Sequence, residues 1–321
     1  MNCLGIEATA HTFGIGIVNE KKILSNVKDS YTTEKGGIIP TEAANHHKRV
    51  KEKVLQDSLN EAKLKIEDID LIAFSNAPGM APCLREGMDL TKELSKKYKI
   101  PIIPVHHSVA HIEVGKLVTG AKDPALLYAS GANTQIIAFE GGKYRVFGET
   151  LDQGIGNFID AFARYVGLGF PGGPKINELA NKSKNLIELP YSVKGMDLAF
   201  SGILTKLKQL YDSKKYKLED LSYSLQETAF AMLLEVSERA MAHTDKKELL
   251  LGGGVACNTR LKEMSEIMCK ERGAKCFIPP NPVLVDNGAM IAVAGLKYFD
   301  KKKKYEIDIN PYQRIDQVEF N

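Results

Sequence analysis

Short apolar runs alternate along the chain with longer segments in which apolar residues recur every three or four positions. The runs have the length and composition of strands, and the segments have the periodicity of helices. The predicted strands are 2–7, 13–18, 70–75, 101–105, 125–130, 134–139 and 248–252. The predicted helices are 42–64, 84–98, 106–119, 173–184, 221–243, 256–272 and 287–299. This alternation favours an α/β fold over a helix bundle or a β-sandwich.

One arrangement, a strand followed by a short turn of small residues and a second strand, occurs twice. The first copy runs from Leu4 to Val18, and the second runs from Leu127 to Phe139. Small residues form tight turns, and they also let backbone N–H groups approach a phosphate closely. The repeat predicts two lobes of related design, with the turns as candidate phosphate-binding elements.

Composition places the chain among globular proteins, since 44% of its 321 residues are apolar and 26% are charged. Its five cysteines are scattered without a CxxC pair, which argues against a disulfide scaffold or a thiolate zinc site and favours the cytoplasm. A net charge of +3 does not by itself indicate nucleic-acid binding. We expect no signal peptide, because the N-terminus lacks a basic region and carries Glu7 and His11 within its apolar stretch. We expect no membrane span, because no apolar run is long enough.

The segment VHHSVAH at 105–111 carries the strongest chemical signal. His107 and His111 are four residues apart, so on a helix they lie on one face, at a spacing that suits a transition metal. The alternative is a histidine cluster that caps the helix or faces the core. Asp286 is the best third ligand, or else the N-cap of the following helix. Two histidines and one carboxylate suit iron or zinc. The pair His46 and His47 lies in a charged helix and is interpreted as an exposed face.

Three further segments have features of a nucleotide site. Glycines 252–254 precede Asn258 and would let a flat base approach the backbone, and the turn at 170–174 could form one wall of a base pocket. Asp160 could bind ribose hydroxyls, or form an ordinary helical ion pair with Arg164. Neither a P-loop nor a dinucleotide-binding GxGxxG motif is found.

A series of motifs spans nearly the whole chain. In chain order they are LGIEAT, GGIIPTEAANHH, APGMAPCLREG, HHSVAH, YASGANTQ, ETLDQGIGNFIDAFAR, FPGGP, MDLAFSGI, GGVACNTRL and DNGAMIA. Together they resemble the catalytic-subunit family of tRNA N6-adenosine threonylcarbamoyltransferases, formerly labelled O-sialoglycoprotein endopeptidases. The tail INPYQRIDQVEF is similar to the archaeal and eukaryotic branch of that family.

The resemblance implies the actin-like ATPase superfold of sugar kinases, Hsp70 and actin, with two related lobes and a central cleft. We expect an N-terminal lobe at 1–104, completed by 296–321, and a C-terminal lobe at 105–295 with the metal and nucleotide site. The implied reaction transfers a threonylcarbamoyl group from threonylcarbamoyl-AMP to N6 of adenosine 37 in tRNAs that read codons beginning with A.

The resemblance also assigns site residues. It implies one divalent metal, with iron preferred and zinc possible, and the ligands His107, His111, Asp286 and Tyr128. A phosphate-binding loop would comprise Tyr128, Ala129, Ser130, Gly131, Ala132 and Asn133. Ribose and base contacts would come from Asp160, Gly173, Asn177 and Asn258, with ATP or AMP (and magnesium with ATP) as further ligands. Glu7 is the candidate catalytic residue.

Three positions depart from the family pattern. Ala132 replaces a loop glycine and tolerates close approach but not a positive φ, Asn177 replaces a ribose-binding glutamate, and Asn76-Ala77 departs from a glycine-rich stretch. The implied partners are tRNA and a KEOPS-type assembly with a small protein kinase, a dimerising subunit and an accessory subunit. Two alternatives stay open: a small-molecule kinase or carbamoyltransferase of the same superfold, and a non-catalytic nucleotide-binding scaffold.

Overall fold

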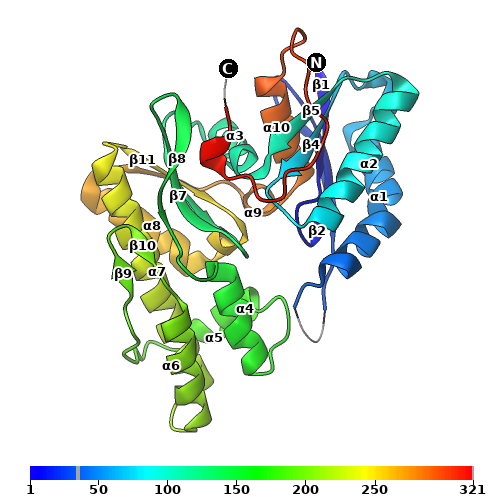
Figure 1. The fold of residues 1–321 in the computed structure, drawn as a ribbon. Coiled ribbons are helices and arrows are strands. Elements are labelled where there is room, and N and C mark those ends of the chain that lie inside the picture. Colours follow the sequence, from blue (N-terminus) through cyan, green and yellow to red (C-terminus); the bar gives the residue numbers. More distant parts are fainter. Residues whose placement is uncertain (34–36, 320–321) are drawn as a thin grey trace. The chain divides into compact units, whose positions relative to one another are not determined.

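The computed structural model describes residues 1–33 and 37–319 and divides the chain into two compact units. The first unit contains Met1–Thr32, Ile38–Val118 and the segment that begins at Val285, and the second is formed mainly by Thr119–Leu284. In Figure 1 the orange and red C-terminal segment lies among the blue and cyan elements of the first unit. After the long excursion through Thr119–Leu284, the chain therefore returns to complete the first unit.

A five-stranded sheet forms the centre of the first unit, in the order β3-β2-β1-β4-β5. Its strands are β1 (Asn2–Glu7), β2 (Thr12–Asn19), β3 (Ile23–Ser30), β4 (Leu71–Ala77) and β5 (Ile102–His106). Strands β1, β4 and β5 are parallel, whereas β2 and β3 run antiparallel to their neighbours. The carboxyl ends of β1, β4 and β5 therefore meet at one edge of the sheet.

Helices cover both faces of this sheet. Helices α1 (Pro40–Ala62) and α2 (Ala81–Tyr98) pack on the face that presents Leu4 and Ile6. Helix α10 (Gly288–Tyr298) packs on the opposite face, where a Cβ on Gly5 would meet the backbone nitrogen of Ala292 at 2.3 Å. The remaining elements are α3 (His107–Thr119) and the short 3₁₀ helices η1 (Ile66–Asp68) and η3 (Ile315–Gln317). The alternation of side chains along β1 thus decides which helix covers which face.

The unit boundaries differ from the expected lobes at 1–104 and 105–295. Helix α3 and the segment 285–295 belong to the first unit, not to the second. The reason is local, because α3 continues directly from β5 and α10 packs on β1, β2 and β4. All three residues of the expected histidine and aspartate set consequently lie within the first unit.

The second unit is built around another five-stranded sheet. Its strands are β6 (Ala125–Ala129), β7 (Thr134–Glu140), β8 (Lys143–Glu149), β11 (Glu248–Gly252) and β12 (Lys275–Phe277), in the order β12-β11-β6-β7-β8. Its helices are α4 (Ile155–Tyr165), α5 (Gly173–Ala180), α6 (Ser201–Asp212), α7 (Leu218–His243), η2 (Gly254–Cys257), α8 (Thr259–Arg272) and α9 (Asn281–Leu284). A small hairpin pairs β9 (Val193–Lys194) with β10 (Asp197–Leu198).

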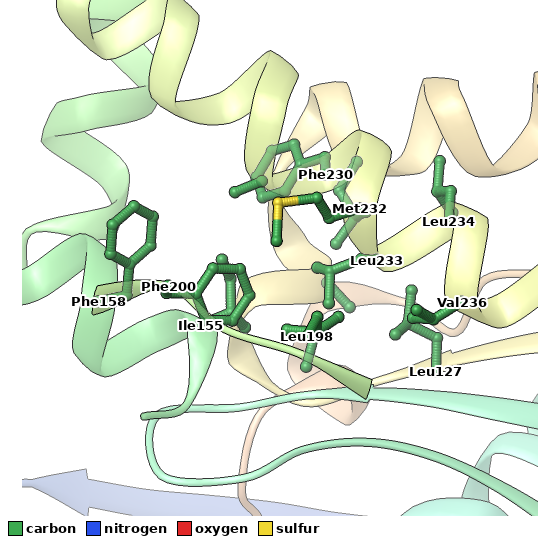
Figure 2. Packing of buried hydrophobic residues seen from close by; sticks show 14 of the residues in the cluster. Leu127, Ile155, Phe158, Leu198, Phe200, Phe230, Met232, Leu233, Leu234 and Val236 are labelled. Carbon is green, nitrogen blue, oxygen red and sulfur yellow. The ribbon is translucent and has the colours of Figure 1, made fainter. Parts of the chain in front are cut away.

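Helix α7 supplies much of the core of this unit. Figure 2 shows side chains from this helix, among them Phe230, Met232, Leu233 and Val236, packed with Leu127 of the sheet and with Leu198. Phe158 and Phe200 stack with ring centroids 5.1 Å apart. Because these residues are almost completely buried, the core holds α4, α6 and α7 as one packed body.

The two sheets share one topology. Each strand of the first sheet has a counterpart in the second, with the same neighbours and the same directions. The counterparts of β1, β2, β3, β4 and β5 are β6, β7, β8, β11 and β12, in that order. The repeat predicted from two strand–turn–strand segments therefore extends over the whole sheet. The expectation that the two halves are related in design is confirmed.

Some elements were not predicted from sequence. The edge strand β3 reads ILSNVKDS, in which only Ser25 is buried, so it lacks an apolar pattern. Helices α4 and α6 are short and contain glycine near their starts, which weakens their helical signal. Among the described residues, no helix combines the length and apolarity needed to cross a membrane.

The interpretation of the pair His46 and His47 as an exposed face is wrong for His47. This side chain is fully buried, its Nε2–H donates to the carbonyl oxygen of Ala10 at 3.0 Å, and its ring packs against Phe13. Helix α1 turns this residue toward β2, whereas the Nε2 atom of His46 lies 3.0 Å from an oxygen of Asp29.

Candidate functional site

The junction between β5 and α3 places two histidines at the carboxyl edge of the first sheet. β5 ends at His106, and α3 begins with His107 and carries His111 one turn later. Both side chains are almost completely buried, and their ring centroids are 4.8 Å apart in an edge-to-face arrangement. The helical spacing predicted from sequence is therefore present, and both rings lie side by side.

Asp286 completes this group from the other end of the chain. Its Oδ1 atom lies 3.4 Å from Nε2 of His107 and 3.3 Å from Nε2 of His111. The N-cap of α10 is the neighbouring Asn287, whose side-chain oxygen accepts from the backbone N–H of Met290. Asp286 is thus left to face the histidines, which removes the alternative of a simple capping role.

The electrostatics favour an uncharged His111 and an ionised Asp286. Burial lowers the pKa of His111 below its usual value, and the hydrogen bond to Asp286 opposes this only in part. Burial alone would raise the pKa of Asp286, but the charge of His107 and hydrogen bonds from both imidazoles hold that pKa well below its usual range. A neutral imidazole and an ionised carboxylate are the forms that bind metals.

The group fits a transition metal ion. One ligand atom from each of His107, His111 and Asp286 can be chosen so that all lie within 4.8 Å of one another. Two imidazole nitrogens and one carboxylate oxygen suit iron or zinc better than magnesium, which prefers oxygen ligands. These three residues therefore form a candidate metal site.

Glu7 contacts the ring nitrogen of His107 that does not face Asp286. Its side chain is fully buried, and its Oε2 atom is 3.0 Å from Nδ1 of His107. The other oxygen accepts from the backbone N–H of Thr9 at 2.7 Å and from the Thr9 hydroxyl. A proton on Nδ1 of His107 would satisfy this contact, and Nε2 of the same ring faces Asp286.

Thr9 is a residue that the sequence analysis did not assign. Its hydroxyl oxygen lies 3.3 Å from Nδ1 of His107, beside the Glu7 carboxylate. A hydroxyl two residues after a buried carboxylate, at a strand end, was the available signal. Only the pairing of β1 with the rest of the sheet brings both residues to the histidines.

The expected phosphate loop lies in the second unit, between β6 and β7. Ser130 and Asn133 close it, since the Ser130 N–H donates to the Asn133 carbonyl and the Asn133 N–H donates to the Ser130 hydroxyl. Gly131 and Ala132 are exposed at its tip, and neither has a positive φ. The alanine at 132 therefore fits the loop without backbone strain. Tyr128 precedes the loop as a buried residue of β6.

Helix α4 begins against this loop. The backbone N–H groups of Gly156 and Asn157 donate to the carbonyls of Ser130 and Gly131, both at 3.0 Å. A Cβ on Gly154 would lie 2.4 Å from the carbonyl oxygen of Gly131. The glycines of the segment GIGN thus allow a close approach that fixes the loop.

Asp160 and the turn at 170–174 are brought together, as a shared site would require. The Oδ1 atom of Asp160 accepts from the backbone N–H of Gly172 at 2.7 Å. Gly173 begins α5, with open space where a Cβ would stand, and the Oδ1 atom of Asn177 on the same helix is buried with no hydrogen-bond partner. Roles in ribose and base binding stay predictions for these residues.

Asn258 has a structural role in addition to the predicted one. Its side-chain oxygen accepts from the backbone N–H groups of Arg260 and Leu261, so it caps α8. Its amide nitrogen donates to the buried Gln226 at 2.5 Å. The side chain is thereby held in one orientation at the carboxyl end of β11, and contact with a base stays a prediction.

Comparison with known proteins identifies the family. The model of the family described as TsaD, tRNA N6-adenosine threonylcarbamoyltransferase, matches residues 22–293. A protein of that name from Thermococcus kodakarensis is 56% identical over 99% of both chains. One from Thermofilum pendens is 48% identical, covering 99% of this chain and 96% of its own. A probable bifunctional tRNA threonylcarbamoyladenosine biosynthesis protein from Methanocaldococcus jannaschii is 50% identical, and the match covers 60% of its length.

Solved structures confirm the fold class. Full-length HypF, in a phosphate- and nucleotide-bound form, superposes with a TM-score of 0.62 at 12% identity, covering 92% of this chain and 55% of its own. The activator of 2-hydroxyisocaproyl-CoA dehydratase from Clostridium difficile gives 0.58 at 12% identity, covering 92% and 94%. At such identities the likeness shows the actin-like ATPase fold alone. With the family model matched over most of the sequence and relatives matched from end to end, this chain belongs to the tRNA N6-adenosine threonylcarbamoyltransferase family.

Proposed function

We propose that this chain transfers the threonylcarbamoyl group of threonylcarbamoyl-AMP to N6 of adenosine 37 in tRNAs that read codons beginning with A. The observation that carries the proposal is the 56% identity over 99% of both chains with a relative named for tRNA N6-adenosine threonylcarbamoyl transfer. The set of His107, His111 and Asp286 supports it, because a kinase of the same fold needs no such nitrogen ligands.

The proposed metal is iron, with zinc as the alternative, and His107, His111 and Asp286 would hold it. Tyr128 is the proposed fourth ligand. Such an ion supplies Lewis-acid polarisation of a bound oxygen, typically several kcal/mol of transition-state stabilisation. Glu7, which contacts Nδ1 of His107, would act as a positioning residue that fixes the tautomer of this ligand. This replaces the expected catalytic role of Glu7, since its carboxylate is fully buried and already contacts Thr9 and His107.

The second unit supplies the proposed adenylate site. Backbone N–H groups at the exposed tip of the loop 128–133 would bind the phosphate of the AMP leaving group, as loops of small residues do. Asp160, Gly173, Asn177 and Asn258 would contact the ribose and base. The unpaired, buried Oδ1 of Asn177 supports this, because a ribose hydroxyl would satisfy it. ATP or AMP would occupy the same site, with magnesium accompanying ATP.

The proposed reaction replaces a C–O bond by a C–N bond. N6 of the adenosine attacks the carbamoyl carbon, AMP leaves with the electron pair of the bond from that carbon to the phosphate oxygen, and N6 loses one proton to solvent. The adenosine has to leave its stack to present N6 to a buried group. Holding both substrates in place is the contribution we assign to the protein.

The proposal includes a cytoplasmic location and KEOPS-type partners: a small protein kinase, a dimerising subunit and an accessory subunit. Because the chain carries a net charge of only +3, we expect partners to supply much of the affinity for tRNA. Filter binding at physiological salt checks this, and tight binding of tRNA by the isolated chain would contradict it.

The deciding experiment is transfer onto tRNA from pre-made threonylcarbamoyl-AMP, with and without the partner proteins. His111→Ala is expected to abolish transfer and metal content while the circular dichroism spectrum is unchanged. The matched control is His46→Ala in the same unit. Full activity of His111→Ala would refute the metal role. Phosphorylation of a small molecule by ATP and magnesium would favour the kinase alternative, and nucleotide binding without any transfer would favour the scaffold.

A further inference from the structure

The tail of the first unit holds one aromatic side chain out into solvent. Tyr312 is 92% exposed, more than any other large hydrophobic side chain in the described part of the chain. It follows Pro311 in a turn closed by the Gln313 N–H, which donates to the Asn310 carbonyl at 3.2 Å. Single exposed hydrophobic residues are common on protein surfaces, so exposure alone carries little meaning.

The anchoring of this turn sets it apart. The Asn310 N–H donates to the carbonyl of Asn76 at 2.8 Å, and the Gly79 N–H donates to the carbonyl of Pro311 at 3.1 Å. On the other side of Tyr312, the Gln313 carbonyl accepts from Nε2 of the buried His106 at 3.2 Å. Ile315 is 2% exposed and fixes the chain beyond the turn. The ring is therefore presented from a backbone tied down on both sides, which reduces the entropy lost when a ligand binds.

The turn lies at the edge of the sheet that carries the candidate metal site. Asn76 is the penultimate residue of β4, and His106 ends β5 directly before His107. On the other flank, a Cβ on Gly79 would lie 2.7 Å from the carbonyl oxygen of Thr9, whose hydroxyl is 3.3 Å from Nδ1 of His107. Both flanks of the tyrosine turn thus rest on the segments that position the metal ligands.

We propose that Tyr312 is a stacking platform for a nucleobase of the tRNA substrate, next to the adenosine that is modified. The inference deepens the proposed function and rests on it. Proteins that read unstacked RNA bases stack them on exposed aromatic rings, and each such contact contributes enough affinity to detect by substitution. A rigid aromatic at the reactive edge has the chemistry to hold a base that neighbours an extruded adenosine.

The absence of tryptophan from the sequence allows a direct test. Tyr312→Trp places a single tryptophan at the platform and keeps an aromatic ring. Its fluorescence is expected to be quenched on titration with an anticodon stem-loop that contains the target adenosine. A quench by the partner proteins alone, with none on adding RNA, would overturn the proposal in favour of a protein contact.

Kinetics with the assembled proteins give a second, independent readout. Tyr312→Leu removes stacking but keeps an apolar side chain, and it is expected to raise KM for the stem-loop about tenfold with little change in kcat. Tyr312→Phe should restore wild-type KM, and Tyr216→Leu, at a 41% exposed tyrosine of the second unit, should have no effect.

The two proposals fail in different ways. If the wild-type chain transfers nothing to any tRNA, the proposed function fails. If wild type is active while Tyr312→Leu keeps its KM and the Tyr312→Trp fluorescence ignores RNA, the stacking platform alone is overturned. Metal content and thermal unfolding of both variants, measured in parallel, are expected to equal wild type because the side chain is exposed.

Discussion

At the scale of single residues, the candidate metal site includes one buried carboxylate that contacts a candidate ligand, His107. Glu7 faces Nδ1 of His107 at 3.0 Å, while Asp286 faces Nε2 of the same ring at 3.4 Å. The two carboxylates therefore lie against opposite nitrogens of one imidazole. With a metal bound at Nε2, the contact with Glu7 would keep the proton of His107 on Nδ1.

Glu7→Gln tests this assignment. The amide oxygen can still accept from Nδ1, but the negative charge that raises ligand basicity is lost. We expect the metal affinity to fall by roughly 10- to 100-fold, as for other residues behind a ligand. Competition with a chelator measures it. Glu86→Gln, in the same unit beside Lys51, serves as the control. Unchanged metal affinity combined with lost transfer would instead mean that Glu7 acts on the substrate.

At the scale of elements, the position of Asp286 is set by how closely α10 approaches the sheet. Gly5 and Gly16 of β1 and β2 face the helix start, where Gly288 packs against the backbone of β2. Glu113 of α3 bonds both Lys297 and Tyr298 at the other end of α10. The helix that follows Asp286 is thereby fixed at both ends, to the sheet and to the histidine helix.

Gly16→Ala is expected to disturb this packing. Its Cβ would lie 2.2 Å from the backbone nitrogen of Ala289, so the helix has to shift. We expect a loss of about 1–3 kcal/mol in unfolding free energy, typical of overpacking, together with weaker metal binding. Urea denaturation and chelator competition measure the two effects. Gly202→Ala is the control, because nothing lies within 4 Å of its added Cβ. Equal effects of both variants would contradict the close-approach argument.

Helix α1 carries a second testable feature in His47. Burial lowers the pKa of this residue from 6.5 to about 4, and the hydrogen bond to Ala10 offsets this only in part. Since the folded-state pKa lies below the unfolded value, stability from His47 is full above pH 6.5 and is lost as the pH falls toward 4. The shift corresponds to roughly 3 kcal/mol.

His47→Gln should remove this pH dependence. In the presence of a chelator, the difference in unfolding free energy between wild type and variant is expected to narrow as the pH falls from 7 to 4. Urea denaturation at several pH values measures it. The control is His243→Gln, at an exposed histidine of the second unit. A difference that is constant with pH would show that His47 titrates normally.

At the scale of the whole molecule, two sheets of the same topology carry different candidate sites. The first unit contains the three candidate metal ligands, and the second contains the candidate phosphate loop. The loop follows β6, the central strand of its sheet, whereas the two histidines follow the edge strand β5, so the two candidate sites use different strands of one sheet design.

Metal addition should therefore protect the units unequally. Saturation with zinc at 100 times its Kd stabilises the folded state by about 2.7 kcal/mol. In hydrogen–deuterium exchange we expect zinc to slow exchange in β1, α3 and the start of α10 of the wild type. In His111→Ala, zinc should not slow exchange in these segments. Protection of the β6 peptide with Tyr128 would support this residue as a fourth ligand. Slower exchange confined to α7 and α8 would contradict the assigned site.

The sequence by itself determined most elements and the pairing of His107 with His111, because strand alternation and helical spacing are local properties. It also located the turn at 128–133 and the family. Tertiary structure alone decided that Asp286, 175 residues away, joins His111, that Glu7 lies behind His107, and that the anchored turn presents Tyr312. The tertiary structure also decided the unit boundaries and the burial of His47. Such contacts depend on which strands become neighbours and which face a helix covers, and no local pattern encodes that choice.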